Sequence, residues 1–140
     1  RGLGDVYKRQ VKYGSPEAKE PSVQALASAL KDNSALFRHE ICFVFGELCH
    51  PSSAAAMTAV LNDEAEHEMV RHEAAEALGG VLEEADEAGE ELSTYDKVVQ
   101  ALQRWAHDDA APRVVRESCV VALDEIAYNN DPTQFHRVEA

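Results

Sequence analysis

The fold of this chain is decided by a nine-residue stretch that occurs twice, as RHEICFVFG at residues 38–46 and as RHEAAEALG at residues 71–79. The two copies start 33 residues apart and share their Arg, His, Glu and Gly positions, while the positions between are mostly apolar or small. A repeat period in the thirties is typical of stacked helical hairpins, which place equivalent residues side by side on one surface. We therefore predict an all-α array in which two neighbouring helices bring their His-Glu pairs together.

The rest of the chain divides into segments of helical apolar periodicity, separated by short polar breaks. Six helices, paired as three hairpins, are expected at residues 22–30, 35–49, 54–61, 69–82, 94–106 and 114–128. The acidic run at residues 83–91 is expected to be a solvated loop. Residues 1–10 match nothing that follows and are interpreted as a non-native leader. Residues 11–130 would then form the repeat domain and residues 131–140 a loose tail.

A third copy of the pattern lacks the His-Glu pair. Residues 115–123, VRESCVVAL, align with residues 70–78, VRHEAAEAL, so that Glu117 and Ser118 stand where the second copy has His and Glu. The hairpin itself therefore does not require the motif. We interpret the two complete copies as a functional site and the third as the bare scaffold.

Composition and charge exclude several classes of function. The chain is 45% hydrophobic and 28% charged, with a formal net charge of −13. Such a charge repels nucleic acid and favours a cationic substrate or a basic protein surface. The three cysteines include no Cys-x-x-Cys pair, which indicates a reducing compartment. Without an apolar run of about 18 residues or a signal peptide, we expect no membrane partner and a cytoplasmic location.

The paired residues suit a metal ion. Packed helices lie about 8–10 Å apart, so that His39 and His72 on adjacent helices can share one ion. One of Glu40 and Glu73 would complete the coordination, and the other would face a substrate. Two histidines and a carboxylate with open positions are typical of non-haem Fe(II) oxygenases, although zinc takes the same ligand types. The competing interpretation from spacing alone is that these are inherited surface residues at helix starts.

Two other histidine patterns are interpreted as structural. His67 precedes a glutamate but has no counterpart in the repeat, and we expect it to be exposed in a polar turn. Residues 64–67 have the Glu-x-x-His spacing of ferritin-like sites, but the spacing occurs once and in a turn. We therefore assign neither pattern to the site.

At these residues the chain resembles the C-terminal half of the deoxyhypusine hydroxylase family. The resemblance rests on SALFRHE at 34–40, MVRHEAAEALG at 69–79 and VVRESC at 114–119, in this order. It implies HEAT-type helical hairpins in two similar halves, each with two His-Glu motifs. It also implies a di-iron centre, with two Fe(II) ions per complete enzyme, that uses dioxygen as co-substrate. The implied reaction hydroxylates the deoxyhypusine side chain of a eukaryotic translation initiation factor, which completes hypusine formation.

The resemblance also assigns roles to residues of this chain. The implied metal set is His39, Glu40, His72 and Glu73, and Glu40 would sit nearest the substrate amines as a catalytic and substrate-binding residue. Gly46 would leave room for the substrate to approach closely. A complete enzyme of the family would carry two more His-Glu motifs, so that we expect this chain to be a fragment with half of the site.

Two other functions are compatible with helical hairpins. The first is a non-catalytic HEAT-repeat scaffold for protein interactions, and the second is a HEAT-like lyase that attaches pigments. Helical repeats host many functions, so the fold alone cannot discriminate between them. The His-Glu pairs in successive repeats favour the metal enzyme, because neither alternative needs them.

Overall fold

The computed structural model describes residues 16–88, 92–131 and 133, and its regular elements there are all helical. These elements are α2 (Pro16–Ser28), η1 (Ala29–Lys31), α3 (Ala35–Leu48), η2 (Pro51–Ser53), α4 (Ala54–Asn62), α5 (Glu68–Ala88), α6 (Leu92–Ala106) and α7 (Arg113–Asn129). The predicted all-α class is confirmed. The expected leader at residues 1–10 and most of the expected tail lie outside the described residues.

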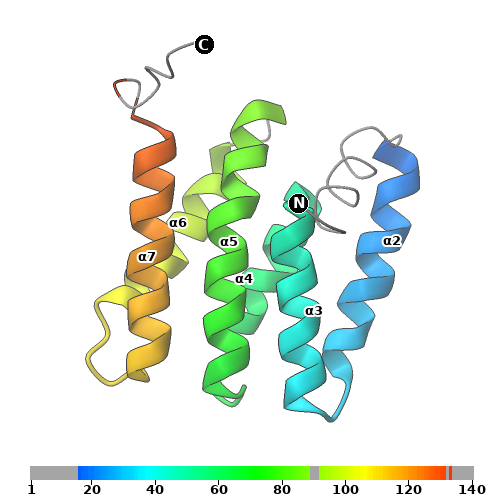
Figure 1. Cartoon of the computed structure of the whole chain (residues 1–140), viewed down its shortest axis with the longest axis horizontal. Helices are drawn as coiled ribbons and strands as arrows, with labels where there is room; N and C mark the ends of the chain where they lie inside the picture. Colours follow the sequence, from blue (N-terminus) through cyan, green and yellow to red (C-terminus); the bar gives the residue numbers. More distant parts are fainter. Residues whose placement is uncertain (1–15, 89–91, 132, 134–140) are drawn as a thin grey trace, which may run out of the picture.

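The helices that carry the repeated motif form one row. Figure 1 shows α3, α5 and α7 side by side, with α4 and α6 behind them. Helix α5 packs against both α3 and α7, and α4 and α6 pack behind α5 and α7. The motif of residues 38–46 therefore faces that of residues 71–79 across a single helix–helix interface, as stacked hairpins require.

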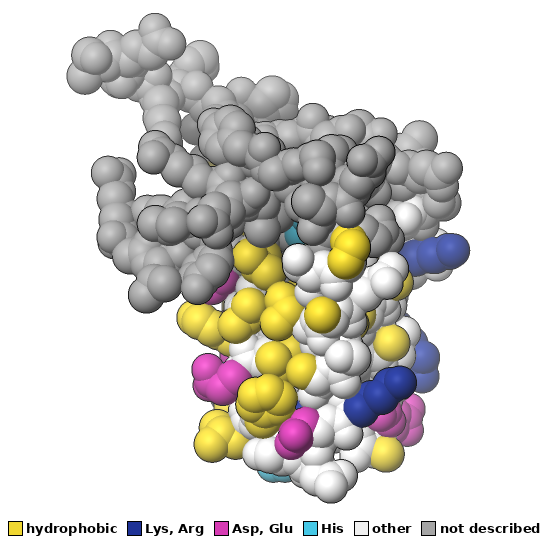
Figure 2. Space-filling view, turned by 90° about the vertical axis from the view of Figure 1, so that its right-hand side faces the viewer, with side chains coloured by type: hydrophobic (Ala, Val, Ile, Leu, Met, Phe, Trp, Pro, Cys, Tyr) yellow, Lys and Arg dark blue, Asp and Glu magenta, His cyan; other side chains and the backbone are white. Residues whose placement is uncertain are grey.

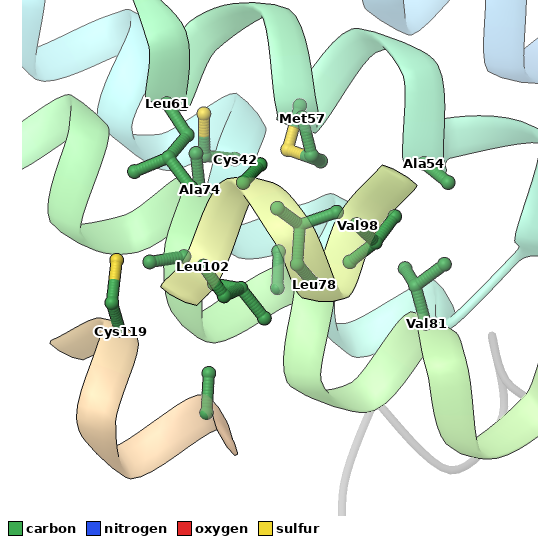
Figure 3. Packing of buried hydrophobic residues seen from close by; sticks show 14 of the residues in the cluster. Cys42, Ala54, Met57, Leu61, Ala74, Leu78, Val81, Val98, Leu102 and Cys119 are labelled. Carbon is green, nitrogen blue, oxygen red and sulfur yellow. The ribbon is translucent and has the colours of Figure 1, made fainter. Parts of the chain in front are cut away.

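The core lies between this row and the helices behind it. Figure 3 shows buried side chains of α3, α4, α5, α6 and α7 meeting there, among them Cys42, Met57, Leu78, Leu102 and Cys119. Burying a side chain of the size of Leu or Met contributes about 1.5–3 kcal/mol. These contacts fix how α3, α5 and α7 lie against one another, and thus where their polar faces meet.

Two expected boundaries are wrong. Helix α5 continues to Ala88, so that the first six residues of the acidic run at 83–91 are helical and not a loop. Glu and Ala are strong helix formers, so that a run of acidic and small residues can continue a helix. Helix α2 begins at Pro16 instead of residue 22 and runs through Pro21. A proline near a helix start removes one backbone hydrogen bond and does not always stop the helix.

The turn before α5 aligns this helix with α3. Arg38 donates hydrogen bonds from Nε and Nη2 to the two carboxylate oxygens of Glu66, at 2.7 and 2.6 Å. The exposed His67 caps α5: its Nδ1 accepts a hydrogen bond from the backbone N–H of Met69 at 3.1 Å. The prediction that His67 is exposed in a turn is confirmed, and its role there is structural.

Apolar side chains also reach the surface. Figure 2 looks onto the α2 side of the array, where hydrophobic side chains gather beside acidic and basic ones. On α3, Leu36 is 73% exposed and Phe43 is 47% exposed. Among the helices that the structure describes, none combines the length and the hydrophobicity that a bilayer span needs.

Candidate metal centre

Three of the predicted site residues meet at one carboxylate oxygen. His39 extends from α3, and His72 and Glu73 extend from α5. The Nε2 atom of His39 lies 3.1 Å from Oε2 of Glu73, and the Nε2 atom of His72 lies 3.8 Å from the same oxygen. The expectation that the two imidazoles approach each other on neighbouring helices is confirmed. Both ring nitrogens thus lie within 3.8 Å of the same carboxylate oxygen.

The close approach of α3 and α5 depends on small residues. A Cβ atom at Gly46 would lie 3.4 Å from the backbone Cα of Ala77, at the near limit of an ordinary van der Waals contact, so that a larger side chain would meet the backbone of α5. Gly46 also lines the neighbouring cavity. Its expected role was to leave room for a substrate. In the structure the partner that lies closest to Gly46 is α5 itself, so that Gly46 sets the spacing at which His39 reaches Glu73.

Glu73 is a buried carboxyl group with an unusual environment. Only 8% of the residue is exposed. Burial raises the pKa of Glu73 above its usual value, and the neighbouring His39 lowers it in part. Glu76 and Glu40 raise this pKa further, whereas His72 lowers it. A carboxylate in this position lacks solvation, and a bound cation would supply the missing favourable interaction.

The other ring nitrogen of His72, Nδ1, contacts a residue of the third repeat. Nδ1 of His72 lies 2.5 Å from Oγ of Ser118, which extends from α7. The Ser118 hydroxyl donates to the backbone carbonyl of Val114 at 2.7 Å. Ser118 was taken for part of a bare scaffold, and the structure corrects this interpretation because α7 contacts the site.

Glu40 stands apart from the other three residues. Its side chain is 59% exposed, and its Oε1 lies 3.4 Å from Nδ1 of His39. That nitrogen is nevertheless a buried polar atom without a hydrogen-bond partner, because the geometry with Glu40 does not align. Glu40 is therefore a neighbour of His39 that is open to solvent and makes no aligned hydrogen bond with it.

Glu76 also belongs to the cluster, although the sequence analysis did not include it. One ligand atom each from His72, Glu73 and Glu76 all lie within 4.8 Å of one another. Glu76 follows His72 by one helical turn, with Oε1 3.6 Å from Nδ1 of His72. The corresponding position of the first copy is Phe43, so that a search for repeated residues passes over it. The spacing of four residues between His72 and Glu76 is the sequence signal that could have identified Glu76, because residues at this spacing lie on the same face of a helix.

A cavity of about 400 Å³ opens next to these residues. It lies between α3, α5 and α7, and its wall combines apolar groups with several carboxylates. Its acidic lining residues are Glu47, Glu73, Glu76 and Glu125. The cavity joins the buried Glu73 to the surface and gives the site an acidic approach.

The donor set fits iron. Two imidazole nitrogens and one carboxylate oxygen form the combination that non-haem Fe(II) enzymes use, and zinc takes the same donors. The poorly solvated Glu73 indicates a site whose polar groups are incompletely satisfied by the protein alone.

The thiols of Cys42 and Cys119 do not compete with the metal ligands as reactive groups. Burial raises the pKa of Cys42 to about 12, and burial likewise raises the pKa of Cys119 to about 12. A thiol with such a pKa is almost entirely protonated near neutral pH and is a poor nucleophile. The chemistry of this site therefore depends on imidazole and carboxylate groups.

A family model described as HEAT repeats matches residues 23–124. The chain therefore belongs to the HEAT-repeat family, in agreement with the stacked hairpins and the repeated motif.

Its relatives within this class are deoxyhypusine hydroxylases. The chain is 64% identical over 132 residues to deoxyhypusine hydroxylase of Mycosarcoma maydis, covering 94% of this chain and 37% of the relative. It is 49% identical over 113 residues to the enzyme of Drosophila melanogaster, covering 81% of this chain and 33% of the relative. The resemblance that the three sequence blocks indicated is confirmed.

A solved structure gives the same result. The structure of human deoxyhypusine hydroxylase in complex with glycerol is similar with a TM-score of 0.64 and 41% identity. The similarity covers 78% of this chain and 33% of the human chain. The chain thus spans about a third of the length of the relatives that it matches.

Proposed function

We propose that this chain is part of an iron-dependent monooxygenase that hydroxylates the deoxyhypusine side chain of a eukaryotic translation initiation factor. The reaction would complete hypusine biosynthesis. The observation that carries the proposal is the meeting of His39, His72 and Glu73 at one oxygen atom across the α3–α5 interface. The similarity to deoxyhypusine hydroxylases supports the choice of reaction.

In this proposal His39, His72 and Glu73 hold the metal. When bound there, iron would supply the activation of dioxygen that hydroxylation of a C–H bond requires. The protein holds the three donors on two rigid helices, in a region where Glu73 is almost fully buried. Donors that are fixed before the metal binds need little rearrangement, and a buried carboxylate gains more from a cation than an exposed one.

We assign the recognition of the substrate amines to Glu40. Its side chain is 59% exposed and lies beside His39, so that it can bind an ammonium group of a substrate close to the metal ligands. The acidic wall of the neighbouring cavity and the net charge of −13 would both attract a cationic side chain. Gly46 lines the same cavity and, because it has no side chain, leaves space there for the substrate.

The remaining parts of the proposal concern the complete enzyme. Two iron ions would act together there, and this chain's two His-Glu pairs would provide the donors for one of them. Dioxygen would be the co-substrate and the initiation factor the protein partner. We place the reaction in the cytoplasm, because the buried thiols of Cys42 and Cys119 suit a reducing compartment.

The test is an anaerobic Fe(II) titration of the 140-residue chain, of His72→Ala and of His67→Ala. We expect the first variant to lose specific binding while its helical circular dichroism is retained. His67→Ala removes a helix cap and should lower the free energy of unfolding by about 1 kcal/mol, yet retain the metal. Binding that survives in His72→Ala, or that His67→Ala abolishes, would contradict the proposed site.

A further inference from the structure

The residue equivalent to Glu73 in the next repeat also contacts the histidine of the preceding helix. Glu73 on α5 reaches back to Nε2 of His39 on α3 at 3.1 Å. Ser118 takes the equivalent place in α7, and it reaches back to Nδ1 of His72 on α5 at 2.5 Å. Each motif helix is thus contacted by a residue of the helix that follows it, with a carboxylate at the first interface and a hydroxyl at the second.

The hydroxyl of Ser118 has a defined direction. It donates its proton to the backbone carbonyl of Val114 at 2.7 Å, one turn earlier in α7. Its oxygen lone pairs are then directed at the ring of His72. Since a neutral imidazole carries one proton, Nδ1 of His72 is the donor in this contact and Nε2 keeps its lone pair. That lone pair faces Oε2 of Glu73 at 3.8 Å.

We propose that Ser118 is the positioning residue of His72, which holds the imidazole in the Nδ1–H tautomer with the Nε2 lone pair turned to Glu73. This role rests on the proposed function, in which Nε2 binds the metal. Two electron-rich atoms that face each other are unfavourable in the absence of a cation, and an unrestrained ring would rotate or change tautomer. Groups that orient a ligating histidine in this way typically influence metal affinity about 10- to 100-fold.

The location of Ser118 suits this role. Only 5% of the residue is exposed, and α7 packs against α5. Water therefore cannot easily replace the hydroxyl as acceptor. The other acceptor near this nitrogen is Oε1 of Glu76 at 3.6 Å, which belongs to a side chain that is 48% exposed. Ser118 is nearer and more deeply buried, and its position is fixed by its own bond to Val114.

The direct test is the tautomer of His72 in the metal-free chain, read from the side-chain ¹⁵N resonances in alkaline buffer, where imidazole is neutral. We expect Nδ1–H in the native chain, loss of this preference in Ser118→Ala and its return in Ser118→Thr, which keeps a hydroxyl. Ser53→Ala is the matched control, because Ser53 is also buried and donates to a backbone carbonyl, that of His50 at 2.7 Å. The control should leave the His72 signals unchanged.

The second measurement is metal affinity in the same variants. Ser118→Ala should bind Fe(II) about 10- to 100-fold more weakly than the native chain, with its helix content retained. A native His72 that carries its proton on Nε2 would overturn the proposal. So would a Ser118→Ala variant that keeps Nδ1–H, and this result would give the role to Glu76. If the native chain shows the expected tautomer but binds no metal, the proposed function fails while the role of Ser118 in orienting His72 stands.

Discussion

Glu73 connects the two copies of the motif at the level of single residues. Its carboxylate lies on α5, beside the histidine of its own copy, and also approaches the histidine of the preceding copy. Neither copy provides this arrangement alone. Glu73 therefore acts on the preceding repeat as well as on its own.

The exposed Glu40 should act on the substrate and not on the metal. We expect Glu40→Ala to weaken binding of a deoxyhypusine-containing peptide about 10- to 150-fold, the equivalent of a charge-assisted hydrogen bond of about 1.5–3 kcal/mol. Fe(II) affinity should change little, because the side chain is 59% exposed and lies beside Nδ1 of His39, whereas Nε2 of His39 faces Glu73. Calorimetric titration with the peptide and with Fe(II) separates the two effects. An equal loss of both would show that Glu40 is itself a ligand.

Glu66 gives a prediction for pH. Its hydrogen bonds with the Arg38 guanidinium lower the pKa of Glu66, burial opposes this, and the backbone N–H of His67 lowers it further. Because the pKa in the folded state is below that in the unfolded state, the stabilisation is complete above the unfolded pKa of about 4.3. It is lost as the pH falls through the folded value.

Glu66→Gln should therefore lower the free energy of unfolding by about 1–2 kcal/mol at neutral pH. The difference from the native chain should shrink in acid, where the native carboxyl group is protonated as well. Urea denaturation at neutral and acidic pH measures both quantities. A difference that stays constant down to the lowest pH would mean that the ion pair with Arg38 contributes nothing.

The sequence identified some of these residues and missed others for a physical reason. The 33-residue period predicted that His39 and His72 occupy equivalent positions on adjacent helices, and the structure agrees. Ser118 and Glu76 have different side chains from their counterparts in the other repeats, so that a search for repeated residues could not identify them. Their contributions depend on distances between helices, which a linear pattern does not contain.

At the scale of elements, the spacing of α3 and α5 controls the site. Gly46→Ala should change the free energy of unfolding by less than about 1 kcal/mol, because the added Cβ meets Ala77 at van der Waals distance and alanine has the better helix propensity. Gly46→Leu should cost about 1–3 kcal/mol and weaken Fe(II) binding, since the larger side chain forces the helices apart. Thermal denaturation and metal titration test both variants. Native metal affinity in Gly46→Leu would show that the spacing does not matter.

The extent of the elements was harder to predict than their number. Helix α5 runs through part of the acidic segment up to Ala88, where charge alone had suggested a loop. Charge patterns report solvent exposure, and exposure is compatible with a helix as well as with a loop. The strongly periodic apolar segments gave the six main helices, because burial of one face determines both the period and the packing.

At the scale of the whole molecule, the chain should bind about one iron ion, because His39 and His72 both approach the same oxygen of Glu73. A ligand that binds only the folded state stabilises it by about 2.7 kcal/mol when its free concentration is 100 times Kd. Fe(II) should thus raise the melting temperature of the native chain and leave that of His72→Ala unchanged. Metal analysis and anaerobic scanning calorimetry provide the test. Two tightly bound ions per monomer would contradict this count of ligands.

The division of the donors between α3 and α5 has a consequence for assembly of the chain. His39 extends from α3 and the other donors extend from α5, so that both imidazoles are available to one ion only after the first hairpin has docked on the second. Loading with iron then reports that the interface has formed in the correct register, and it slows the separation of these two helices in particular. A newly synthesised chain whose hairpins are misaligned would lack the His39 donor and bind iron more weakly, and this weaker binding would distinguish it from correctly folded copies.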